Sequence, residues 1–159
     1  MSLRDEINRG LREISDGKKT LSLDEQGRCT IPVPMPPSVV KLNEGRLVVT
    51  VELARSEQYV SLSTPLAEIT GEPGEEFYRA LLYRQRFADQ TSGVGFALDL
   101  EGENDRVVGI YHWMLQSIAP EEFSALFQSF VGGALGLIEE LKAMAQQTQG
   151  IHPLHPGVG

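Results

Sequence analysis

Apolar residues recur every three or four positions in three stretches of this chain, which is the spacing of a helix with one apolar face. The stretches cover about residues 3–15, 73–89 and 119–145. Glutamate pairs lie near the start of the second and third stretches, where the positive end of the helix dipole stabilises acidic side chains. The sequence therefore predicts three helices.

The remaining periodic segments favour strands, because apolar and polar residues alternate along most of them. Strands are expected at residues 46–54, 58–66, 93–100 and 106–118, with one or two short strands around a turn within 20–33. Three prolines within residues 33–45 are incompatible with a full ladder and predict an exposed loop or a sheet edge. The order α-β-β-β-α-β-β-α predicts an α+β domain with an antiparallel sheet.

Length and composition narrow the class of protein. The 159 residues fit a single domain over 1–147, followed by a tail over 148–159 that we expect to be disordered. The net charge of −8 disfavours nucleic acid and anionic membranes as partners. One cysteine, Cys29, excludes an internal disulfide framework. No signal sequence and no apolar run of roughly 20 residues is visible, so we expect a cytoplasmic protein without a membrane span.

Two elements carry more apolar surface than one core requires. The strand within 106–118 is apolar on both faces, and the apolar residues of the helix within 73–89 spread well beyond one face. Such surplus favours a homodimer, whose interface resembles a domain core cut in half. The alternative is a monomer in which the loop and the tail cover the second face.

The last helix carries a continuous apolar stripe that predicts packing on the sheet. The stripe consists of Phe123, Leu126, Phe127, Phe130, Ala134, Leu137 and Leu141. Gly132 and Gly136 are expected either to let the helix approach the sheet closely or to mark a bend.

No group of residues indicates catalysis, a cofactor or a metal site. His152 and His155 lie in the proline-containing tail, whereas a metal site needs at least three well-placed ligands. His112 is interpreted as a packed or interface histidine, and Cys29 as a buried thiol. Three arginines of the middle helix are expected to form ion pairs with acidic side chains. They are Arg79, Arg84 and Arg86.

The ordered combination of several local sequences resembles the class I type III secretion chaperones, the CesT-like or Tir chaperone family. The resemblance is carried by YVSLSTPLAEI, EEFYRALLYRQ, TSGVGFALDLEGENDRVVGIYHWML and APEEFSALFQSFV. It is best between about Leu47 and Met144. None of these sequences is a catalytic signature.

The resemblance implies an acidic, cytosolic homodimer without catalytic activity, which holds the N-terminal segment of a secreted effector in extended form. Apolar strips would receive alternate side chains of the segment, and a free sheet edge would add a strand. The dimer interface implied in this way comprises Leu82, Phe87, Phe96, Ile110, His112 and Trp113. The implied effector-binding residues are Leu3, Ile7, Leu11, Leu21, Leu23, Ile31 and Val33.

Two other functions stay open at this point. One is a regulatory or scaffold protein of the same fold that binds a folded partner and has no role in secretion. The other is an enzyme or ligand-binding domain with a pocket around Trp113 and His112, which would require converging polar groups.

Overall fold

The computed structural model describes residues 2–15, 20–34, 46–69, 71–114, 122–147 and 151–153. Its helices are α1 (Leu3–Ile14), α2 (Glu75–Arg84) and α3 (Phe123–Gln147), and a 3₁₀ segment, η2 (Gln85–Thr91), continues α2. Its strands are β1 (Arg28–Pro34), β2 (Arg46–Leu53), β3 (Tyr59–Ile69), β4 (Gly95–Asp99), β5 (Asp105–Met114) and β6 (Ile151–Pro153). The expected α+β class and the element order are confirmed.

The strands form one antiparallel sheet in the order β1-β2-β3-β5-β4, with β6 added to β3. The central pair joins β3 to β5, from Tyr59 opposite Met114 to Ile69 opposite Asp105. β1 and β4 lie at the two ends of this order. The first two residues of the proline-rich segment predicted over 33–45, Val33 and Pro34, belong to β1, so the expected sheet edge is confirmed there. Residues 35–45 lie outside the described residues.

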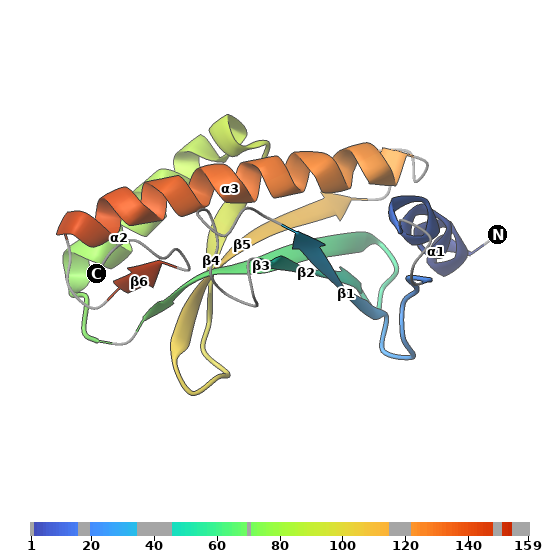
Figure 1. Cartoon of the computed structure of the whole chain (residues 1–159), viewed down its shortest axis with the longest axis horizontal. Helices are drawn as coiled ribbons and strands as arrows, with labels where there is room; N and C mark the ends of the chain where they lie inside the picture. The colour runs from blue at the N-terminus through green and yellow to red at the C-terminus, as the bar shows by residue number, and fades with distance from the viewer. Residues whose placement is uncertain are drawn as a thin grey trace.

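The core lies between the sheet and the helices, which gather on one side of it (Figure 1). The apolar stripe predicted on α3 packs there, and Phe123, Ala134 and Leu137 are fully buried. α1 closes one end of this layer, since Gly10 meets the ring of Phe123. On β5, Val107 and Trp113 point into the core, whereas His112 and Met114 lie on the opposite, open face.

Three local expectations differ from the structure. The region around Leu21 and Leu23 forms no strand, so β1 is the only strand between residues 20 and 34. The helix expected to continue to residue 89 changes into the 3₁₀ segment after Arg84, with a kink at Phe87. The disordered tail is wrong for Ile151–Pro153, because this segment pairs with Ala67–Ile69 of β3.

The glycines of α3 also act differently from the expectation. A side chain at Gly132 would meet no atom within 4 Å. A Cβ at the neighbouring Gly133 would collide with the carbonyl oxygen of Thr91 and with Val94. The close approach therefore occurs at Gly133, and it brings α3 against η2 rather than against the sheet.

Candidate protein-interaction surface

Helix α2 buries one of its sides and exposes another. Phe77, Leu81 and Arg84, spaced four and three residues apart, are buried against the rest of the chain. Leu82 and Tyr83 remain 72% and 61% exposed. Since apolar side chains of this size are usually withdrawn from water, the exposed side is a candidate for contact with another chain.

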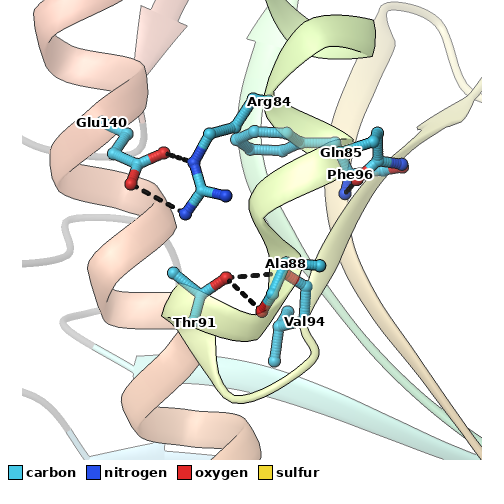
Figure 2. Close-up of polar contacts among 7 residues, drawn as sticks. All are labelled: Arg84, Gln85, Ala88, Thr91, Val94, Phe96 and Glu140. Atoms are coloured by element: carbon cyan, nitrogen blue, oxygen red, sulfur yellow. Dashed lines mark hydrogen bonds and ion pairs between the residues drawn. The ribbon is translucent and has the colours of Figure 1, made fainter.

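An ion pair with α3 fixes which side of α2 faces inward (Figure 2). The guanidinium of Arg84 donates from Nη2 to Oε1 of Glu140 at 2.9 Å and from Nε to Oε2. The side chain of Arg84 is 11% exposed, so the bidentate pair is shielded from water on the arginine side. This pair and Arg79–Glu75, at 2.8 Å, confirm the ion pairs expected for two of the three arginines.

A shallow apolar cavity of about 330 Å³ separates α2 from strand β4. We call it the α2–β4 groove and define it by its lining residues, which are Tyr78, Leu81, Leu82, Gln85, Phe96, Ala97 and Leu98. The side-chain amide of Gln85 spans the groove to the main chain of β4, where Phe96 N donates to Gln85 Oε1 at 2.7 Å and Gln85 Nε2 donates to Phe96 O.

Most exposed apolar side chains belong to the two elements that form this groove, and Leu82 and Leu98 line it. Among the described residues, five large hydrophobic side chains are strongly exposed: Leu82, Tyr83, Leu98, Leu100 and Met114. Four of these belong to α2 or to β4 and the residue after it, and only Met114 lies elsewhere, at the end of β5. Sequence reasoning missed Tyr83, Leu98 and Leu100, because a periodic pattern shows which residues are apolar but not which of them the chain leaves uncovered.

The residues expected at a dimer interface do not share one surface. Leu82 lies on the exposed side of α2, Phe87 is half-buried at the kink, and Phe96 is buried at the floor of the groove. Ile110 and His112 lie on the open face of the sheet, where Gly95 of β4 is opposite Ile110. Trp113 is fully buried, with its ring 5.8 Å from that of Phe123. A side chain without exposed surface cannot touch a partner directly.

The residues expected to bind an effector divide in a similar way. Ile7 and Leu11 are fully buried, and Leu23 and Ile31 are nearly so. The half-buried members keep some surface in water, and they are Leu3, Leu21 and Val33. Of these, Leu21 and Val33 pack against the core.

The structure contradicts a pocket formed by His112 and Trp113, because neighbouring residues of a strand point to opposite faces of the sheet. Nδ1 of His112 lies 3.1 Å from Oγ of Ser61, and the ring of Tyr59 meets the His112 ring edge-on. These contacts are those of a packed surface histidine.

A larger cavity of about 610 Å³ lies at the other end of the sheet and is charged rather than apolar. Arg4, Arg28 and Arg55 line it together with Glu25, Glu52 and Glu57. Arg28 and Glu52 form an ion pair at 3.0 Å, so part of this charge is neutralised within the chain.

Within the described segments, histidine, cysteine and acidic side chains do not gather in groups of three suited to a metal ion. None of the helices in those segments combines the length and apolar character needed to span a membrane.

No family model and no curated protein matches the sequence. Solved structures do resemble the fold. A chain in the crystal structure of the ExsC–ExsE complex aligns with a TM-score of 0.61 and 19% identity over 90% of this chain and 96% of its own length. A chain in the structure of the HopA1–SchA chaperone–effector complex gives a TM-score of 0.52 and 15% identity over 89% and 91%. The α+β fold of this chain is therefore one that also occurs in a chaperone–effector complex.

Proposed function

We propose that this chain is a non-enzymatic, cytoplasmic chaperone of type III secretion, which forms a homodimer and holds the N-terminal segment of a secreted effector. The observation that carries the proposal is the exposed apolar surface at the α2–β4 groove, on a fold shared with a chain of a chaperone–effector complex. The resemblance of the sequence to the CesT-like family supports the same function.

The second copy is the proposed occupant of the exposed side of α2. Its two ends differ in charge, because Glu76 lies in the first turn beside the Glu75–Arg79 ion pair and Arg86 follows the last turn. Two α2 helices that cross antiparallel near Leu82 bring the acidic end of each towards the basic end of the other, as a two-fold interface requires. In this interface Leu82 and Phe87 contact the partner, while Phe96 supports the groove from beneath.

The effector is proposed to bind at the opposite end of the sheet. Leu3, Leu21 and Val33 offer partly exposed apolar surface there, and the charged cavity beside Arg4 and Arg28 lies at the same end. Ile7, Leu11, Leu23 and Ile31 hold this surface in place from the core. A segment that becomes ordered on binding loses conformational entropy, so a long wrapped interface is required for useful affinity.

Co-expression tests the chaperone function. This chain is produced with the product of a neighbouring gene whose N-terminal segment is disordered, and the complex is digested with protease and analysed by mass spectrometry. We expect a soluble complex in which that segment is protected. Digestion of the segment at the same rate with and without this chain would contradict the proposal. Protection of a folded domain alone would favour a scaffold function.

Leu82→Asp tests the dimer in the same preparation. Burying a charge at the centre of an apolar interface is expected to weaken the dimer by at least about 2 kcal/mol, which is roughly a 30-fold increase in Kd. Light scattering at micromolar concentration measures the mass. Met114→Asp is the matched control, because it places the same charge at an exposed apolar position outside the groove, and we expect it to remain dimeric.

A further inference from the structure

The ladder between β2 and β3 stops well before the end of β3. The last pair that joins these two strands is Thr50 opposite Ser63. Two residues further along β3 stands Pro65, which has no N–H to offer to a partner strand. Since β3 continues to Ile69, its final residues do not have β2 as a neighbour.

The side chain of Thr64 marks the point at which the two strands separate. If the register continued, Val48 would lie opposite Pro65, where the carbonyl oxygen of Val48 would find no N–H. Oγ1 of the buried Thr64 donates to that oxygen at 2.8 Å instead. The ladder therefore ends at a proline, and a hydroxyl group satisfies the carbonyl that the proline leaves without a donor.

β6 takes the place of β2 beside the final residues of β3 (Figure 1). Its residues Ile151–Pro153 pair antiparallel with Ala67–Ile69, and His152 lies opposite Glu68. The other side of the same residues of β3 pairs with β5. A segment from the C-terminal end of the chain thus occupies a strand edge in the middle of the sheet.

Alternation along β3 identifies the main-chain groups that face β6. Ala54 N donates to Tyr59 O at 3.1 Å, so the odd-numbered residues at the start of β3 face β2 and the even-numbered ones face β5. The bulge within β3 inserts one residue and reverses this order. Glu68 therefore directs its N–H and C=O towards β6, whereas Ala67 and Ile69 direct theirs towards β5.

We infer that this edge of β3 is a strand-accepting site, that Ile151–Pro153 occupies it in the free chain, and that an extended segment of the effector displaces β6 from it. The identity of the competitor rests on the proposed function. The edge is a second contact of the effector, beyond the surface around Leu3 and Val33, and a long wrapped segment can reach both.

The short length of β6 suits it to displacement. Three residues are the lower limit of ordinary strand lengths, and Pro153 has no N–H. Of the three pairs that join β6 to β3, only His152 and Glu68 direct their main-chain groups towards each other. A segment that adds side-chain contacts to the same main-chain bonds competes with β6 successfully.

The neighbours of the edge define the segment that fits it. Ala67 and Ile69 are buried on the side of the sheet that α3 covers. Glu68 lies on the opposite side, where its carboxylate is 3.2 Å from Nη2 of Arg106. Residues opposite each other in an antiparallel pair share a side of the sheet, and opposite charges there attract. A segment with an apolar, a basic and an apolar residue in succession therefore fits this edge.

Hydrogen exchange of single amides, resolved by NMR on the full chain, tests whether β6 occupies the edge. His152→Pro removes the N–H that faces Glu68, whereas His152→Ala, the matched control, also lacks the imidazole but keeps that N–H. We expect the Glu68 amide to exchange roughly fivefold faster in His152→Pro, the loss expected for one ordinary hydrogen bond. The amides of Ala67 and Ile69 should keep their wild-type rates, because they face β5. Equal exchange at Glu68 in all three chains would overturn the occupation.

Titration of the effector segment tests the displacement. The probe is the N-terminal segment of the neighbouring gene's product, added to the wild type and to both variants. The apparent Kd rises as the fraction of chains with an open edge falls, so His152→Pro should bind the segment roughly fivefold more tightly than the wild type. His152→Ala should bind as the wild type does. Weaker binding to His152→Pro would show that the segment adds to the outer edge of β6, and would overturn the displacement.

The two measurements separate this inference from the proposed function. Equal affinity of the segment for all three chains would leave the chaperone function standing and refute the displacement. If the segment binds none of the chains, the chaperone function and the effector as competitor both fail. The exchange rate of Glu68 in the free chains still decides in that case whether Ile151–Pro153 occupies the edge.

Discussion

Helices α1 and α2 have similar lengths and both carry apolar residues at helical spacing, but the chain uses them in opposite ways. α1 buries Ile7 and Leu11 completely, and Phe123 at the start of α3 lies against the same helix at Gly10. α2 buries Phe77 and leaves Leu82 in water. Apolar periodicity therefore identifies a helix whose apolar face is expected to be buried. The tertiary structure determines whether other residues of the same chain bury it.

The largest expected effect separates the two helices by their contribution to folding. Leu11→Ala should lower the free energy of unfolding by about 2–5 kcal/mol, because it leaves a cavity in the core. Leu82→Ala should change the free energy of unfolding by no more than about 0.5 kcal/mol, because shortening an exposed side chain removes few contacts within the chain. Urea unfolding, at a concentration at which the chain is monomeric, measures both. Equal losses for the two variants would remove the distinction between the helices.

The same distinction sets the limit of what the sequence predicts. The three helices, the α+β class and the alternation along β2 and β3 follow from spacing alone, because the backbone period and one-sided burial leave a direct pattern in the residues. The spacing of apolar residues was not enough to assign Trp113 to a dimer interface or Ile7 to an effector-binding surface. Both are apolar residues in regular patterns, and the sequence does not show that Phe123, which is distant in the chain, packs on Trp113 and against α1 at Gly10.

The hydrogen bonds of the main chain could not be predicted from the sequence for a similar reason. Gln85 appears in the sequence as one more polar residue after a helix, and its bond to Phe96 exists only because η2 brings it beside β4. The short strand Ile151–Pro153 has no alternation long enough to be noticed, and it forms on an edge that β3 provides. The two prolines of β1 are the exception, since a proline has no N–H in any fold and its preference for a sheet edge was predictable.

A pair of glycines sharpens the comparison by testing how α1 is covered. Gly10→Ala would place a Cβ at 2.8 Å from Cβ of Phe123, so we expect a loss of about 1–3 kcal/mol from overpacking. Gly132→Ala in α3 meets open space and should instead stabilise the protein by about 0.5–1 kcal/mol, because alanine restricts the unfolded chain and favours the helix. Thermal unfolding shows whether each variant is more or less stable than the wild type. A neutral Gly10→Ala would mean that α1 does not pack on Phe123 as closely as described.

The smallest expected effect concerns the first turns, where the two helices also differ. Ser2 caps α1, since Asp5 N donates to Ser2 Oγ at 3.2 Å, and Ser2 Oγ and N donate to the carboxylate of Asp5 at 2.7 and 3.1 Å. The hydrogen bond from the Ser2 side chain, followed by that from its backbone, lowers the pKa of Asp5 from its ordinary value of 3.8. α2 begins after Gly74, which has no side chain to act as a cap.

A carboxyl group whose pKa is lowered by folding stabilises the folded state above its unfolded pKa, and this contribution disappears as the pH falls through the folded pKa. Asp5→Asn should therefore be slightly less stable than the wild type at neutral pH, and the two should converge below pH 3.8. Glu76→Gln, in the first turn of α2, is the matched control and should cost less, because no N-cap side chain binds Glu76. Urea unfolding at a series of pH values measures the difference. A deficit of Asp5→Asn that persists unchanged in acid would show that the charge of Asp5 is not what stabilises the start of α1.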